Sequence, residues 1–255
     1  MSQFKKIGIV GGVSWMSTVE YYNAICQMSH RYSFAQTSSR PPPIPEMTIE
    51  SLNINYTVNH RGQPGDDKSW LLFESYYRNA LKRLEASKVD FAIIASNTPH
   101  NRFEQITAGL RIPVLSIFDE VAKVCVGNNI GTVLILGTEP TMSSSVFPSV
   151  LEKHGVKGVL PDAGPDRELV TSLIDELHSG TAHNAARRMQ TLAAKYMPSV
   201  SERPYAVGLS CTELPLAFPD HLHTPVFRVD GIYYLNTTII HAKAAFDYAI
   251  STEVI

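Results

Sequence analysis

The sequence predicts an α/β fold of two pseudo-symmetric βα domains whose mainly parallel sheets face a central cleft. Short apolar runs of strand length alternate with longer segments of helical spacing. Small polar residues follow two of these runs, at the position where open parallel sheets bind ligands. The same order of strands and helices then restarts halfway along the chain, which indicates an internal repeat.

The repeat consists of three pairs of segments that keep their order but differ in spacing. Residues 132–138 resemble residues 7–12, residues 205–211 resemble residues 90–96, and residues 224–227 resemble residues 112–115. Unequal spacing is expected where two related halves differ in loop length. We therefore predict a first domain of residues 1–112 plus 226–255 and a second domain of residues 113–225.

Composition indicates a globular protein that acts on a small molecule. The 255 residues are 44% hydrophobic and 18% charged with a net charge of −2, which argues against nucleic acid or an anionic membrane as a partner. The amino terminus lacks a signal-peptide pattern, and no run reaches the roughly 20 apolar residues of a membrane span. We expect a cytoplasmic protein. Three widely spaced cysteines favour neither a disulfide framework nor a zinc site.

The first half opens with a buried strand over residues 7–10 and a helix over residues 17–30, capped by Ser17 or Thr18. Between them, Gly11 and Gly12 permit a tight turn whose N–H groups can face an anion such as a carboxylate. A plain strand-to-helix turn explains the glycines equally well. The third glycine of a dinucleotide-binding motif is missing.

The remaining elements are predicted from composition and spacing. Residues 59–68 form a polar loop, either a cover over a site or, as we favour, an ordinary surface loop. For the first half we predict a polyproline-like connector at 40–45, strands at 47–52, 91–96 and 114–117, and helices at 70–87 and from Pro99. For the second half we predict strands at 132–138 and 205–211, helices at 167–177 and 184–197, and a final helix at 231–249 that packs on the first domain.

Cys211 is the strongest candidate for acid/base or nucleophilic chemistry. It ends an apolar run and is followed by Thr212 and Glu213. Backbone N–H groups at the start of a following helix would lower the thiol pKa from about 8.5 toward neutrality. A free cysteine is more often a small buried hydrophobe, and we prefer that interpretation for Cys26 and Cys125.

Ser96 takes the equivalent position in the first half. A hydroxyl is a weak acid and needs a neighbouring base, and His100 lies four residues on. A histidine at a helix start is more usually a polar cap residue. Asn97 and Thr98 can bind a carboxylate without ionising. The pair His221 and His223 lacks a third ligand, so we predict no metal site.

Four segments together resemble the aspartate/glutamate racemases, most closely the enterobacterial subgroup with the motif G-G-x-S-W-x-S-T. They are residues 7–22 (IGIVGGVSWMSTVEYY), 96–100 (SNTPH), 137–142 (GTEPTM) and 210–214 (SCTEL). The resemblance implies an isomerase that interconverts L and D aspartate, glutamate or a related amino acid by 1,1-proton transfer. It also implies a homodimer that needs no pyridoxal phosphate or other cofactor.

The resemblance further implies the site residues. Most members place a cysteine on each side of the substrate α-carbon, and the subgroup has threonine at the first position. Here Ser96 and Cys211 take these places. The candidate substrate-binding residues are Gly12, Ser14, Asn97, Thr98, Thr138, Thr141, Thr212, Glu213 and Lys68.

One position departs from the pattern for acidic substrates. Glu168 stands where members that bind such substrates carry lysine, and Arg167 or Lys68 would compensate. Two alternatives therefore stay open beside the racemase. One is a one-thiol decarboxylase or isomerase of the same superfamily, and the other is a non-catalytic ligand-binding relative.

Overall fold

The protein has an α/β fold with mainly parallel sheets, as the sequence predicted, and it divides into two compact units. The computed structural model describes residues 4–36, 42–63, 65–197 and 202–251. Unit 1 comprises Met1–Ser116 and His241–Ile255, and unit 2 comprises Ile117–Ile240.

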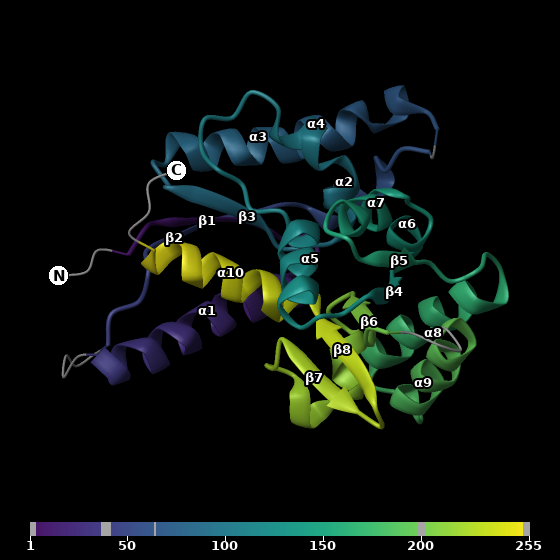
Figure 1. Ribbon diagram of the computed structural model, residues 1–255. Helices are drawn as coiled ribbons and strands as arrows, with labels where there is room; N and C mark the ends of the chain where they lie inside the picture. Colours follow the sequence, from purple (N-terminus) through teal and green to yellow (C-terminus); the bar gives the residue numbers. More distant parts are fainter. Residues whose placement is uncertain (1–3, 37–41, 64, 198–201, 252–255) are drawn as a thin grey trace. The chain divides into compact units, whose positions relative to one another are not determined.

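Unit 1 is built on a parallel three-stranded sheet of order β2-β1-β3. The strands are β1 (Ile7–Gly11), β2 (Met47–Ser51) and β3 (Phe91–Ile94). Every residue of β1 and β3 is buried, as their unbroken apolar sequences require. Figure 1 shows α3 (Leu71–Ala86) over one face of this sheet and α1 (Trp15–Gln36) under the other.

Shorter elements complete unit 1: α2 (Ile54–Asn59), η1 (Asp67–Trp70), η2 (Thr98–Arg102) and α4 (Phe103–Thr107). Of the predicted connector at 40–45, residues 40 and 41 lie outside the described residues. The predicted strand at 114–117 is wrong, because only Val114 forms a bridge, parallel to Ala92. Pro113 has no N–H to donate, and α5 (Ile117–Gly127) begins three residues after the bridge.

Unit 2 contains a five-stranded sheet of order β5-β4-β6-β8-β7, in which only β7 is antiparallel. Its strands are β4 (Thr132–Gly137), β5 (Lys157–Val159), β6 (Tyr205–Ser210), β7 (Val226–Val229) and β8 (Ile232–Asn236). Shorter elements are α6 (Glu139–Met142), η3 (Leu214–Ala217) and η4 (Pro219–His221).

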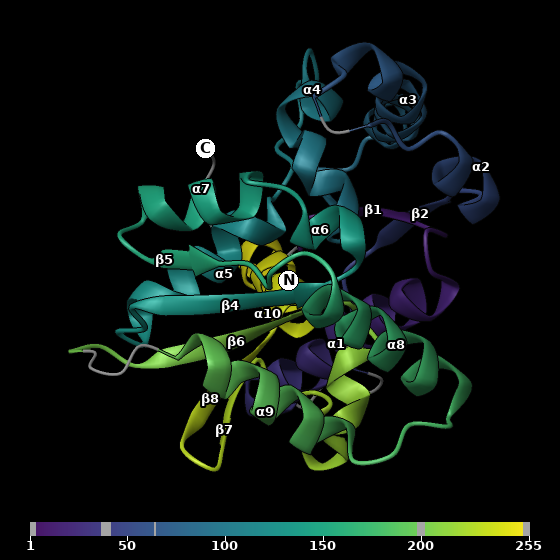
Figure 2. The same cartoon turned by 90° about the vertical axis from the view of Figure 1, so that its right-hand side faces the viewer.

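Alternate residues of the central strands serve the two faces of this sheet. Leu134, Leu136 and Leu209 pack in a core with α8 (Pro165–Ser179) and α9 (Ala185–Tyr196). Val133 and Ile135 pack in a second core with α5 and α7 (Val146–Lys153). The two helix pairs therefore cover opposite faces, as Figure 2 shows.

The predicted final helix over residues 231–249 is wrong in its first part. Asp230 and Gly231 have φ angles of 48° and 85°, as in the two-residue turn of a β-hairpin. That turn joins β7 to β8, and the helix α10 (Thr237–Ile250) begins only after β8. From His241 onward α10 belongs to unit 1, in agreement with the prediction that the last helix packs on the first domain.

The hairpin also corrects the predicted repeat and the predicted domain boundary. In unit 1, Val114 lies beside β3, and in unit 2 the strand beside β6 is β8. The counterpart of the segment at Val114 is therefore β8, and not residues 224–227 as predicted. Because β8 pairs with β6, residues 226–240 belong to unit 2 and not to the first domain.

Among the described residues, none of the helices is long and apolar enough to cross a bilayer. The described part of the chain also gathers no group of three or more His, Cys, Asp or Glu side chains that could hold a metal ion.

Candidate active site

Cys211 follows the last residue of β6, at the carboxyl edge of the unit 2 sheet. Its Sγ donates a hydrogen bond to Glu213 Oε2 at 2.8 Å. Thr212 Oγ1 donates to the same oxygen at 3.1 Å. A single carboxylate therefore holds both the thiol and its neighbouring hydroxyl.

The pKa of the Cys211 thiol is raised well above its ordinary value, contrary to our expectation that it would be lowered. Burial makes the largest contribution, and the charge of Glu213 and its hydrogen bond with the thiol act in the same direction. Hydrogen bonds from the backbone N–H groups of Glu213 and Thr212 lower this pKa, but they do not offset the effects that raise it. Cys211 is therefore a protonated thiol whose hydrogen bond points to Glu213.

Glu213 also faces a histidine that the sequence analysis did not single out. Its Oε1 lies 3.6 Å from Nδ1 of His178, in the last turn of α8. The Glu213 side chain is 9% exposed and the His178 side chain 58% exposed. Residue spacing gave no sign of this contact, because the packing of α8 near η3 brings together residues far apart in the chain.

Thr138 and Thr141 lie at the same sheet edge as Cys211. Gly137 of β4 pairs with Ser210 of β6, and Thr138 and Cys211 are the residues that follow them in the chain. Thr138 is the N-cap of α6, and its Oγ1 lies 3.4 Å from Oγ1 of the buried Thr141. Adjacent parallel strands thus bring hydroxyl groups and the thiol to one edge of unit 2.

Glu168 and Arg167 line a hollow of about 660 Å³ along α8. The hollow is lined by Glu139, Ala163, Gly164, Arg167, Glu168, Thr171, Ser172, Asp175 and Glu176. Arg167 Nη1 pairs with Glu139 Oε1 at 3.1 Å, and its Nε donates to Pro161 O. Arg167 is the only lysine or arginine in a lining with four acidic side chains, and its charge is already shared with Glu139.

In unit 1, Ser96 lies just beyond β3, with Asn97 and Thr98 buried beside it. His100 is fully buried, and its Nδ1 donates to the main-chain oxygen of Ser96 at 2.8 Å. The imidazole therefore fixes the backbone of the Ser96 turn through its Nδ1 proton. His100 Nδ1 is thus not a base for the Ser96 hydroxyl, which was the less favoured of the two roles considered for this residue.

A second buried histidine lies behind this turn. The ring of His241 meets the ring of His100 edge-on at 5.6 Å. Its Nε2 donates to Leu115 O at 3.1 Å, so Nδ1 accepts the Tyr21 hydroxyl at 2.9 Å. Burial, and then His100, lower the pKa of His241 to about 3, despite the opposing bond to Leu115. His241 is therefore neutral over the physiological range.

Gly12 and Ser14 belong to the turn between β1 and α1. Gly12 has a φ of 80°, and a Cβ there would lie 2.2 Å from Leu52 O, so only glycine fits. Its N–H donates to Thr18 Oγ1 at 2.9 Å, which matches the strand-to-helix turn rather than anion binding by this group. Ser14, rather than Ser17 or Thr18, caps α1, since its Oγ accepts from Ser17 N at 3.4 Å.

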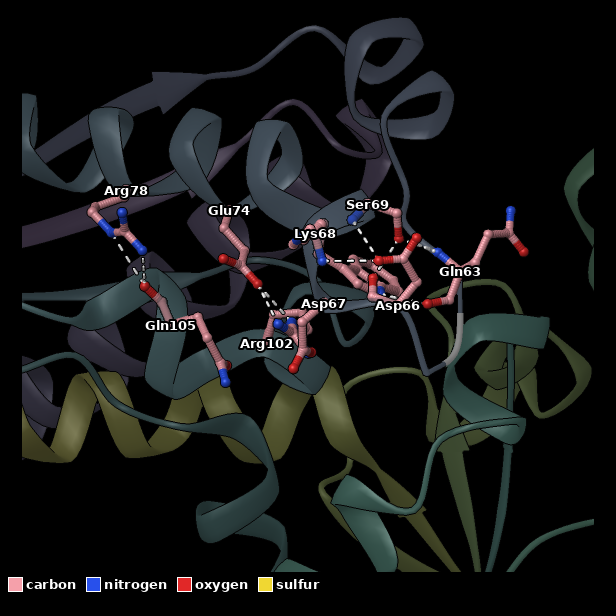
Figure 3. A network of polar contacts seen from close by, with 10 residues as sticks. Gln63, Asp66, Asp67, Lys68, Ser69, Glu74, Arg78, Arg102 and Gln105 are labelled. Atoms are coloured by element: carbon pink, nitrogen blue, oxygen red, sulfur yellow. Dashed lines mark hydrogen bonds and ion pairs between the residues drawn. The ribbon is translucent and has the colours of Figure 1, made fainter.

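Lys68 is exposed in η1, at the end of a loop that polar contacts hold in place (Figure 3). Asp66 Oδ1 accepts from Lys68 N and Ser69 N, and Ser69 Oγ donates to Asp66 O. Arg102 pairs with Asp67 at 2.7 Å and with Glu74 at 2.6 Å. Because Arg102 ends the η2 segment that follows Ser96 and Asn97, it ties this loop to the turn that carries Ser96.

Each unit thus collects its own share of the predicted site residues. Unit 2 brings together Thr138, Thr141, Cys211, Thr212 and Glu213. Unit 1 places Gly12, Ser14, Ser96, Asn97 and Thr98 beyond the ends of β1 and β3, which pair through Val10 and Ile94. Sequence reasoning missed Arg102 and His178, which act through contacts that depend on the fold, and it took Thr18 for a helix cap rather than the acceptor of the Gly12 N–H.

Comparison with known proteins identifies the family of the chain. A family model described as Asp/Glu/Hydantoin racemase matches residues 10–245. The broad specificity amino-acid racemase RacX of Bacillus subtilis is 26% identical over 240 residues, which cover 94% of this chain and 99% of that protein.

Solved structures show the same likeness. A putative Asp/Glu racemase from Yersinia pestis is 27% identical with a TM-score of 0.77, over 97% of this chain and 100% of that chain. An aspartate racemase homologue from Pyrococcus horikoshii is 26% identical with a TM-score of 0.75, over the same two shares. The chain therefore belongs to the Asp/Glu/hydantoin racemase family, a family of isomerases.

Proposed function

We propose that this protein is a pyridoxal-phosphate-independent racemase that interconverts L and D aspartate, glutamate or a related amino acid by 1,1-proton transfer. The observation that carries the proposal is the Cys211 thiol at the end of β6, hydrogen-bonded to Glu213 at 2.8 Å. The names of the Bacillus relative and of the Pyrococcus homologue support an amino acid as the substrate, with aspartate among the candidates.

The mechanism begins with the thiol and the carboxylate. Glu213 Oε2 accepts the Cys211 proton, and the thiolate formed removes the substrate α-proton. Hydroxyl and amide donors next to the strand ends, among them Asn97, Thr98, Thr138 and Thr212, hold the α-carboxylate and stabilise the carbanion. Ser96 is the proposed donor of a proton to the opposite face of the α-carbon.

Ser96 is the weaker of the two acid/base groups. Its hydroxyl is a poor acid, and His100 Nδ1 donates to its main-chain oxygen instead of serving the hydroxyl. This observation favours the second candidate function, a one-thiol decarboxylase or isomerase of the same superfamily. We place it second because the Bacillus relative, which matches 94% of the chain, is named a racemase.

The identity of the substrate side chain depends on the charges around residue 168, which the resemblance assigns to the distal carboxylate and which lines the hollow along α8. Glu168 contributes an acidic group there, and Arg167 is already paired with Glu139. An acidic substrate therefore needs Arg167 to leave Glu139, or Lys68 from the loop of unit 1, to bind its distal carboxylate.

The test is proton NMR of the protein with L- and D-aspartate and L- and D-glutamate in heavy water, with circular dichroism for inversion. Loss of the α-proton signal together with inversion is the expected result. Exchange without inversion means that Cys211 works alone on one face. Absence of exchange with all four amino acids contradicts the proposal for these substrates.

Two substitutions assign the groups. Cys211→Ala removes the thiol and is expected to abolish exchange, whereas Cys26→Ala, at a free cysteine on α1, is the matched control. Ser96→Cys restores a thiol at the first position and is expected to raise the rate of inversion relative to exchange. A fully active Cys211→Ala protein would exclude the mechanism.

We further propose a cytoplasmic homodimer of the subgroup with the G-G-x-S-W-x-S-T motif. Trp15, Val19 and Tyr22 lie on one face of α1, at the spacing i, i+4 and i+7, and their exposed fractions are 70%, 58% and 44%. An exposed apolar stripe of this kind is typical of an interaction surface. It supports association of two copies.

A further inference from the structure

The Cys211 proton has to reach water if the thiol is to act repeatedly. The carboxylate of Glu213, which accepts this proton, is buried and has little direct contact with solvent. Glu213 Oε2 accepts from the thiol and from Thr212, and the carboxylate is 9% exposed. The other oxygen, Oε1, faces Nδ1 of His178 at 3.6 Å. The two oxygens of one carboxylate therefore connect a thiol to an imidazole that is 58% exposed.

Given the racemase function proposed above, we propose that His178 relays the Cys211 proton between Glu213 and water. His178 acts through Glu213 and does not touch the substrate, so it is a positioning and relay residue. An imidazole suits this task because one of its two ring nitrogens can accept a proton while the other releases one.

Each step of the relay conserves atoms and charge. The Sγ–H bond of Cys211 breaks and an O–H bond forms at Glu213 Oε2, which leaves a thiolate and a neutral carboxyl group. A half-turn of that carboxyl group about its soft terminal torsion presents the proton to His178. Nδ1 accepts it, which restores the carboxylate, and the imidazolium releases its Nε2 proton to water.

The geometry permits the second transfer with a small movement. The His178 ring must approach by about half an ångström to reach the usual N–H···O distance, and its exposure leaves room for that movement. Other charged groups near this part of α8 are engaged elsewhere. Glu176 pairs with Arg188 at 2.5 Å and also interacts with His183.

The relay predicts where the α-proton goes once the thiolate has taken it. In heavy water it either returns to the same carbon, leaving no label, or escapes through Glu213 and His178, after which the carbon takes up deuterium. Blocking the escape increases internal return without changing the abstraction step. The measured quantity is therefore the ratio of deuterium incorporated into the unreacted starting enantiomer to inversion. The variants are compared at the same fraction of protein with bound substrate.

The experiment uses whichever enantiomer of aspartate or glutamate the wild-type protein exchanges. His178→Gln is expected to lower this incorporation by at least about tenfold, a smaller effect than the roughly 10²–10⁴-fold of a group that transfers a proton in the transition state. His183→Gln, which removes another exposed imidazole of unit 2, is the matched control and is expected to leave it unchanged. Imidazole added to His178→Gln is expected to restore it.

His178→Lys separates a relay from a simple ion pair. Lysine keeps the positive charge opposite Glu213, but its ordinary pKa of about 10.4 prevents it from accepting a proton near neutrality. Low deuterium incorporation by His178→Lys supports the relay. Incorporation by this variant at the level of the wild-type protein overturns the relay and shows that a positive charge opposite Glu213 is sufficient. Incorporation by His178→Gln at the level of the wild-type protein also overturns the relay, but it leaves the proposed racemase function standing. Absence of exchange in the wild-type protein overturns the proposed function, and the relay with it.

Discussion

At the scale of single residues, the chemistry of unit 2 centres on Glu213. It accepts hydrogen bonds from Cys211 and Thr212 and lies beside His178. In a buried setting a negative charge opposes the ionisation of a thiol. The carboxylate therefore keeps Cys211 protonated in the free protein. In the proposed mechanism it also accepts the thiol proton.

Glu213→Gln is expected to lower the pKa of Cys211, because it removes the charge that raises this pKa. Alkylation of Cys211 by iodoacetamide, followed by peptide mass spectrometry, should then begin at a lower pH than in the wild-type protein. Exchange of the substrate α-proton should fall, because the group that accepts the thiol proton is gone. An unchanged alkylation profile would show that Glu213 does not act on the thiol.

At the scale of elements, Arg102 joins three segments of unit 1. It pairs with Asp67 of η1 and with Glu74 of α3, and it ends η2. Its two partners differ in exposure: the Glu74 side chain is 6% exposed and the Asp67 side chain 86% exposed. An ion pair contributes little at the surface, whereas loss of one partner from a buried pair leaves an uncompensated charge.

Arg102→Ala is therefore expected to lower the free energy of unfolding by about 3 kcal/mol, because Glu74 remains buried without its partner. Asp67→Ala removes only the exposed partner and is expected to cost less than about 1 kcal/mol. Urea unfolding of both variants makes the comparison. Equal losses in the two variants would contradict this division of the network.

His241 links α10 to α1 and to the segment after Val114 through Tyr21 and Leu115. Its pKa is about 3 in the folded protein and near 6.5 in an unfolded chain. Between these values the unfolded chain binds more protons, so the free energy of unfolding falls as the pH is lowered through this window. The slope from this group is at most about 1.4 kcal/mol per pH unit.

Urea unfolding of the wild-type protein and of His241→Gln, at several values between about pH 7 and pH 4, tests this dependence. Glutamine keeps a donor and an acceptor but does not titrate, so the difference between the two proteins isolates the imidazole. We expect the wild-type protein to lose stability faster as the pH falls. Parallel curves would show that His241 accepts a proton in the folded state.

At the scale of the whole molecule, the exposed stripe on α1 bears on assembly. Trp15 is the most exposed of its three residues, at 70%. Trp15→Glu is expected to shift the sedimentation coefficient from that of a dimer to that of a monomer, because a charge at the centre of an apolar contact opposes association. Leu216→Glu, at another exposed apolar residue, is the control. A wild-type monomer at micromolar concentration would exclude the dimer.

The sequence by itself determined β1, β2, β3, β4 and β6, the helices α1, α3, α8 and α9, and the residues at the ends of β3 and β6. Buried parallel strands are short continuous apolar runs, and such local patterns identified β1, β3, β4 and β6. The motifs that resemble the racemases then selected Ser96 and Cys211. Where local pattern was ambiguous the predictions failed: the apolar residues of β8 also fit a helix, and only pairing with β6 made them a strand.

Tertiary structure decided the electrostatics of the site. The sequence predicted a lowered pKa for Cys211 from its place at a strand end, but burial and Glu213 raise it. It also suggested His100 as a base, but its Nδ1 donates to the Ser96 main-chain oxygen. The contact between His178 and Glu213 has no sequence signature. The environment of a titrating group depends on which distant segments pack against it, and local sequence does not encode that packing.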